Sequence, residues 1–62
     1  MKTLNDIKKH PAVKYVSDER SVDDGIWIYL KGEYWNPEME CRIIHEQTIP
    51  EVIQKLKGIK KL

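Results

Sequence analysis

The fold is decided by the stretch Gly25-Ile26-Trp27-Ile28-Tyr29-Leu30-Lys31. Its side chains are β-branched, aromatic or large, and a glycine lies on each side of the apolar run, which is the pattern of a β-strand. Because side chains alternate along a strand, Ile26, Ile28 and Leu30 share one face. Trp27 and Tyr29 share the other face. Both faces of this strand are therefore apolar, and each needs a covering layer.

Two elements are predicted before this strand. Residues 3–10 form a short helix with Thr3 as its N-cap. Pro11 ends the helix, because the residue before a proline avoids helical backbone. Residues 12–17 are β-prone and predict a first strand. The polar stretch 18–25 closes with Asp24-Gly25, a strong turn signal, and its length predicts an irregular connection.

A loop, a strand and a helix are predicted after the central strand. Residues 33–38 form the loop, since Asn36-Pro37 favours a turn, and residues 40–46 form the third strand. Thr48-Ile49-Pro50-Glu51 matches a capping box, which predicts a helix that begins after Thr48. The apolar residues of this helix fall on one stripe at helical spacing: Ile49, Val52, Ile53 and Leu56. Gly58 is a suitable residue to follow its end.

These elements predict one α+β domain over residues 1–62, with the order α-β-β-β-α. Short connections favour a three-stranded antiparallel sheet, with the amphipathic C-terminal helix packed on one face. A chain of 62 residues buries little apolar surface, so we expect a second chain to add stability. The single cysteine, Cys41, forms no intrachain disulfide. We therefore expect a homodimer.

The aromatic residues predict where a partner binds. Two short helices hardly cover both faces of the sheet, and we expect them to cover the aliphatic one. That leaves an apolar aromatic surface, which usually marks a binding site. The predicted partner-binding residues are Trp27, Tyr29, Tyr34, Trp35 and Tyr15. The alternative is that the loop of residues 32–39 folds back and covers these rings itself.

Nucleic-acid binding is the second functional prediction, and we favour it less. Its residues are the basic ones at the C-terminal helix end: Lys55, Lys57, Lys60 and Lys61. Lysines of this kind contact phosphates, and Trp or Tyr rings stack on bases. The net charge is only +1, so binding through bulk charge is not indicated.

We expect no enzymatic activity, no cofactor and no metal. Cys41 and His45 are four residues apart, which on a strand separates them by about 13 Å. A structural zinc site normally needs four cysteine or histidine ligands. This chain offers only three, Cys41, His45 and His10, so a zinc site would have to be shared between two chains. No phosphate loop, nucleophile elbow or membrane span is present, and the N-terminus lacks the apolar core of a signal peptide. We therefore expect a cytoplasmic protein.

The chain resembles a loose group of short bacterial and phage (prophage-type) proteins of uncharacterised function. The pattern comprises Ser17-Asp18-Glu19-Arg20, then residues 24–31, then Ile44-His45-Glu46-Gln47-Thr48 leading into the final helix. The resemblance implies a phage or prophage setting, in which small proteins bind host proteins or counter host defences. The element order is also that of double-stranded RNA-binding domains, without their lysine cluster at the start of the last helix. The β-β-β-α part is similar to the arm-binding domains of phage-type integrases.

Overall fold

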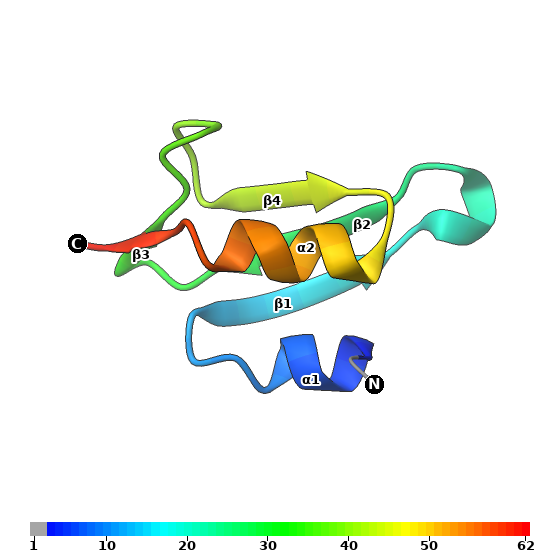
Figure 1. Cartoon of the computed structure of the whole chain (residues 1–62), viewed down its shortest axis with the longest axis horizontal. Helices are drawn as coiled ribbons and strands as arrows, with labels where there is room; N and C mark the ends of the chain where they lie inside the picture. The colour runs from blue at the N-terminus through cyan, green and yellow to red at the C-terminus, as the bar shows by residue number, and fades with distance from the viewer. Residues whose placement is uncertain (1–2) are drawn as a thin grey trace.

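The computed structural model describes residues 3–62, and its main feature is an antiparallel sheet with the strand order β1-β2-β4 (Figure 1). In chain order the elements are α1 (Leu4–Lys8), β1 (Val13–Asp18), the 3₁₀ turn η1 (Arg20–Val22), β2 (Ile26–Leu30), β3 (Tyr34–Trp35), β4 (Ile43–Glu46), α2 (Ile49–Leu56) and β5 (Lys60–Lys61). The predicted α+β fold and its three-stranded antiparallel sheet are confirmed. Met1 and Lys2, which the domain prediction includes, lie outside the described residues.

The central strand of the sheet is β2, as expected from its two apolar faces. Ile28 pairs with Val16 on β1 and with Ile44 on β4. The β1–β2 ladder is interrupted by a bulge between Val13 and Tyr15. Without the extra residue, Val13 and Tyr15 would share one face of the sheet. With it, Val13 is buried on the helix side and Tyr15 is exposed on the opposite side.

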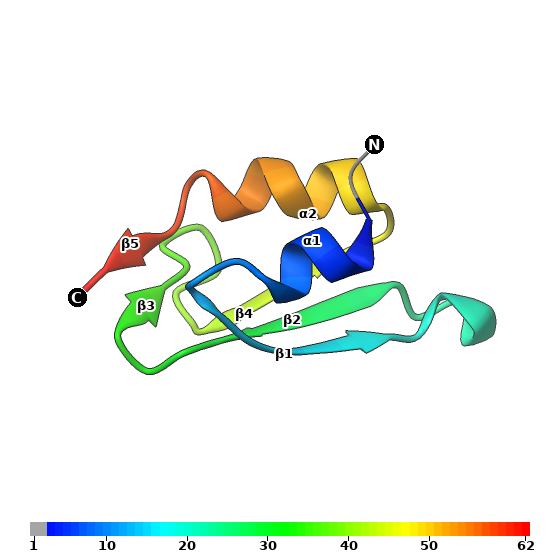
Figure 2. The same ribbon diagram turned by 90° about the horizontal axis from the view of Figure 1, so that it is seen from below.

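The core lies between the sheet and the two helices. Its members are nine buried apolar residues: Ile7, Ala12, Val13, Ile26, Ile28, Leu30, Ile44, Val52 and Leu56. Helix α1 packs against β1, and α2 packs against β4 and β2. Figure 2 shows both helices on one side of the sheet, with no element on the other side. The helices therefore cover the face of Ile26, Ile28 and Leu30, as predicted.

The start of each helix is fixed by a threonine and an acidic side chain three residues later. The backbone N–H of Thr3 donates to the Asp6 carboxylate at 2.8 Å. The Thr48 hydroxyl accepts from the Glu51 backbone N–H at 3.4 Å and donates to the Glu51 carboxylate at 2.8 Å. In the predicted capping box, the Glu51 carboxylate would accept a hydrogen bond from the backbone N–H of Thr48. In the structure it accepts from the Thr48 hydroxyl instead. Both threonines lie at the N-cap, where they satisfy otherwise unpaired backbone donors.

The segment between β2 and β4 differs most from the prediction. The expected loop contains β3, which pairs with β5 in a second, two-stranded sheet. The third strand begins at Ile43, because Glu40 has a left-handed φ of 53° and Cys41 makes a separate bridge with Asn36. Glu38 accepts from Lys55 of α2 at 2.6 Å, so this segment lies on the helix side of the sheet.

Candidate functional site

The sheet face that the helices leave open carries two rows of side chains. Cross-strand register places Tyr15, Tyr29 and Ile43 side by side in one row. The second row is Ser17, Trp27 and His45. We call the surface formed by these two rows the open face. Tyr15 is 60% exposed and Tyr29 is 37% exposed, so this face presents aromatic rings to the surroundings.

Trp27 is held by its neighbours in one orientation. Its ring stacks on the His45 imidazole with 3.8 Å between ring centroids and an interplanar angle of 11°. Its indole N–H donates to the Asp24 carboxylate at 3.0 Å. His45 Nε2 also contacts the Asp24 backbone carbonyl, so that nitrogen carries the proton and donates. This bond joins the end of β4 to the β1–β2 connection.

A shallow hollow of about 230 Å³ lies at this end of the open face. It is lined by Ser17, Glu19, Asp24, Trp27 and Tyr29. The Ser17 hydroxyl donates to the Glu19 carboxylate at 2.7 Å. The hollow therefore combines aromatic rings with two carboxylates, each of which accepts from an uncharged donor. Such a surface favours a cation over an anion, because rings and carboxylates both attract positive charge.

The polar groups of the open face are not arranged for nucleophilic catalysis. Ser17 and His45 flank Trp27 on opposite strands, which separates their backbones by roughly 10 Å. A nucleophile and its base need direct hydrogen-bond contact. Cys41 is half-buried, with its thiol 3.6 Å from the Ile43 carbonyl. Within residues 3–62, no group of three or more His, Cys, Asp or Glu side chains is placed to hold a metal ion.

The structure separates Tyr34 and Trp35 from the other predicted partner-binding residues. Both lie on β3 in the second sheet, and Tyr34 packs against the core. The Arg42 guanidinium lies 5.6 Å from the centroid of the Trp35 ring. Tyr15, Trp27 and Tyr29 are brought together as expected, but the segment that carries Tyr34 and Trp35 neither joins nor covers them.

The predicted basic group is divided between two elements. Lys55 and Lys57 lie at the end of α2, whereas Lys60 and Lys61 form β5. The Lys55 ammonium hydrogen-bonds Glu38, and this bond raises the pKa of Lys55. The Lys61 ammonium lies 4.0 Å from the Glu33 carboxylate. Two of the four lysines thus have their charge partly neutralised within the chain, which disfavours a phosphate-binding cluster.

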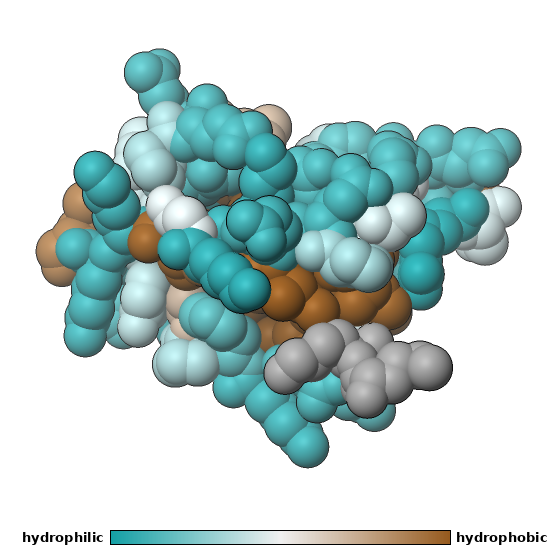
Figure 3. All heavy atoms as spheres, in the orientation of Figure 1, coloured by the Kyte–Doolittle hydropathy of each residue, from teal (hydrophilic) through white to brown (hydrophobic). Residues whose placement is uncertain are grey.

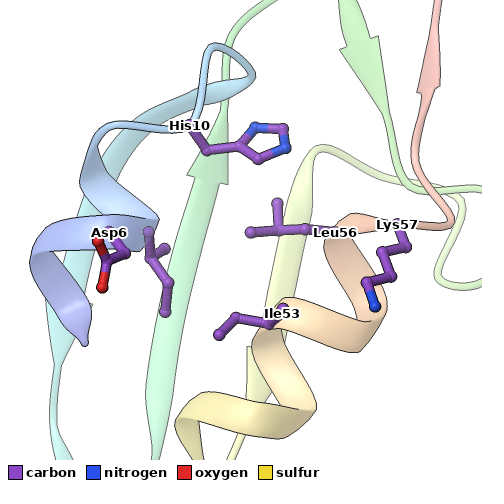
Figure 4. Close-up of a pocket in the computed structure, with 6 residues that line it drawn as sticks. Asp6, His10, Ile53, Leu56 and Lys57 are labelled. Carbon is purple, nitrogen blue, oxygen red and sulfur yellow. The ribbon is translucent and has the colours of Figure 1, made fainter. Parts of the chain in front are cut away.

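The helix side of the molecule has an apolar cleft between α1 and α2, and Figure 3 shows apolar surface on this side. The cleft has a volume of about 200 Å³, below the usual size of a ligand pocket. Figure 4 shows Ile53 and Leu56 of α2 pointing toward α1, with His10 at the rim. His10 Nδ1 accepts from the Ala12 backbone N–H at 3.1 Å. Its polar group therefore serves the local turn, and the cleft is a weaker candidate site.

The sequence interpretation missed Ser17, Glu19 and Asp24 as neighbours of Trp27. In sequence, residues 18–25 have only the composition of a polar connection. The signal that could have located them is the Asp24-Gly25 turn, which brings the ends of two adjacent strands together. The stacking of His45 on Trp27 was also missed, because it depends on a strand register that the sequence does not display.

No helix within the described residues combines the length and the apolar character needed to cross a bilayer. Comparisons with protein-family models, with curated proteins and with solved structures each found no match to this chain. The function is therefore inferred from the geometry of the open face.

Proposed function

We propose that this protein is a non-enzymatic protein-binding module and that the open face is its binding surface. One observation carries the proposal: both helices pack on the aliphatic face of the sheet, and no element within residues 3–62 covers Tyr15 and Tyr29. Tyrosine and tryptophan suit interfaces, because each joins a large apolar body to a polar group. The stacked and hydrogen-bonded Trp27 loses little freedom on binding, which favours association.

The alternative of nucleic-acid binding has weaker support. Two of its four lysines already contact carboxylates. Glu19 and Asp24 border the aromatic rings on which bases would stack, and their charge repels phosphate. A phage or prophage setting, with a host protein as partner, rests on the sequence resemblance alone and stays a prediction.

The proposal is tested with variants that add one carboxylate on opposite sides of the molecule. Tyr15→Glu changes an exposed position on the open face, and Gln54→Glu changes an exposed position on α2. Each full-length chain, checked for its circular dichroism spectrum, serves as bait in a host extract. We expect a protein that wild type and Gln54→Glu both retain to be lost with Tyr15→Glu. The proposal would be overturned if all three baits retained the same host proteins equally. It would also be overturned if no bait retained any protein and the wild-type chain were itself monomeric.

A further inference from the structure

We propose that the partner at the open face is a second copy of this chain, packed face to face with its strands antiparallel to the first. This inference rests on the proposed function and names the partner of the same surface. Its basis is a charge difference between the two ends of the sheet, together with the position of the aromatic rows between them.

One end of the sheet is acidic. The end of β1 and its connection to β2 carry four carboxylates against one guanidinium, and the carboxylates belong to Asp18, Glu19, Asp23 and Asp24. Asp18 forms an ion pair with Arg20 at 2.8 Å. Glu19 and Asp24 accept hydrogen bonds from uncharged groups, the Ser17 hydroxyl and the Trp27 indole. Neither makes an ion pair with any of residues 3–62, so their negative charge is not neutralised within the described chain.

The opposite end of the same strands is basic. Lys14 lies in the bulge at the start of β1, and Lys31 directly follows β2. The Lys31 backbone N–H donates to the Ala12 carbonyl at 2.9 Å, which extends the strand and places Lys31 on the side of Tyr29 by alternation. Both lysines are exposed and form no ion pair with the residues that the structure describes.

Two arrangements bring two open faces together by a two-fold axis in the plane between them. An axis parallel to the strands places the two acidic ends opposite each other, which is repulsive. An axis perpendicular to the strands places each acidic end over the basic end of the other copy. Isologous interfaces of this kind are the commonest in homodimers. The charge distribution therefore selects the perpendicular axis.

The spacing along the strands fits this axis. Trp27 and Lys31 lie two residues on either side of Tyr29, so each is roughly 7 Å from it along β2. With the axis over Tyr29, Lys31 of each copy lies above Trp27 and the hollow of the other. Because Glu19 and Asp24 line this hollow, each Lys31 ammonium comes close to both carboxylates of the other copy. The Tyr15, Tyr29 and Ile43 row meets its own counterpart at the centre.

The size of the face sets the expected strength. Three strands of about five residues span roughly 14 by 17 Å, which is small for a protein interface. Small interfaces are weak and reversible. We expect a monomer–dimer equilibrium that depends on protein concentration and weakens as salt screens the ion pairs.

Sedimentation equilibrium of the pure full-length chain tests the proposal. Lys31→Glu alone and Glu19→Lys alone each place like charges together at the interface, so we expect each to raise the dimer Kd about tenfold. Mixing the two variants places opposite charges together at both symmetric contacts, because each chain then meets the complementary charge on the other. We therefore expect the mixture to associate within about threefold of wild type. Lys57→Glu makes the same charge change on the helix side and is expected to leave the Kd unchanged.

Three results would overturn the second-copy proposal: a wild-type chain that stays monomeric at millimolar concentration, a dimer insensitive to both reversals, or a mixture that associates no better than its components. The circular dichroism spectrum of each variant shows whether it is folded. A monomeric wild type that still loses a captured protein on Tyr15→Glu substitution would leave the proposed function standing. Failure of both experiments would remove both proposals.

Discussion

Gly25 occupies a backbone position that other residues rarely adopt. Its φ is +80°. A Cβ built on it would lie 2.8 Å from the side-chain Nε2 of Gln47 and 2.8 Å from the backbone carbonyl oxygen of Glu46. Only a residue without Cβ lets the β1–β2 connection approach the end of β4 this closely. The orientation of Asp24, and through it that of Trp27, depends on this approach.

We expect Gly25→Ala to lower the free energy of unfolding by about 1–3 kcal/mol, because it adds left-handed strain to a backbone clash. Gly32→Ala is the matched control, since a Cβ there meets nothing within 4 Å. Urea unfolding followed by Trp fluorescence measures both changes. Equal losses in the two variants would contradict the assigned role of Gly25.

Asp18 makes the stability depend on pH. Hydrogen bonds from the Arg20 side chain and backbone lower the pKa of Asp18 from 3.8 to about 2. Because the folded-state pKa lies below the unfolded one, ionised Asp18 stabilises the fold above about pH 4, and this contribution is lost as the pH falls toward 2. Glu46 acts in the opposite direction, since burial raises its pKa and its protonation at low pH adds stability.

We expect Asp18→Asn to be less stable than wild type near neutral pH, and we expect the difference to shrink as the pH falls toward 2, the pKa of Asp18 in the folded state. The ion pair is exposed, so the difference is small. Urea midpoints at the two pH values measure it. A difference that persists unchanged at low pH would show that Asn alters something other than the charge.

The segment between β3 and β4 is held by one buried polar side chain. Asn36 is 4% exposed. Its amide nitrogen donates to the Ile43 carbonyl at 2.9 Å, and its amide oxygen accepts from the Glu38 N–H at 3.2 Å. The residue thus joins the turn at Pro37 to the start of β4.

We expect Asn36→Ala to lower the free energy of unfolding by about 1–3 kcal/mol, since it leaves the Ile43 carbonyl with only the weak, long hydrogen bond from the Cys41 thiol. Met39→Ala changes an exposed residue of the same segment and is expected to cost less than about 0.5 kcal/mol. Thermal or urea unfolding distinguishes the two. A loss at Met39 as large as that at Asn36 would contradict this account.

Sequence patterns predicted the elements that satisfy their own local requirements. The second strand has two apolar faces, and the last helix has both a cap and an apolar stripe, so each was identified with bounds close to those observed. The small sheet of β3 and β5 was missed, because each strand has two residues and Lys60 and Lys61 carry no β pattern. Their pairing depends on contacts distant in sequence. The hollow beside Trp27 was missed for the same reason.

At the scale of the whole molecule, the two faces of one sheet have different surroundings. Ile28 is fully buried, whereas Tyr15 on the next strand is 60% exposed. The first belongs to the layer that holds the helices, and the second belongs to the open face. Alternating residues of the same strands therefore contribute to the core and to the proposed binding surface.

This division predicts opposite results from two substitutions. We expect Ile28→Val to lower the free energy of unfolding by about 0.5–1.5 kcal/mol, because it removes a buried methylene. We expect Tyr15→Ser to change it by less than about 0.5 kcal/mol in dilute solution. Chemical denaturation at low protein concentration measures the fold without a contribution from association. A larger loss for Tyr15→Ser than for Ile28→Val would place Tyr15 in the core.

The bulge at the start of β1 has a consequence for aggregation. β1 is an edge strand of its sheet. The unpaired backbone N–H and C=O groups of an edge strand can pair with strands of other molecules, which leads to aggregation. The bulge breaks the regular spacing of backbone donors and acceptors there, and it places Lys14 in the gap. Strand addition at the β1 margin is therefore disfavoured, which limits fibre growth there and leaves the open face accessible for the proposed pairing.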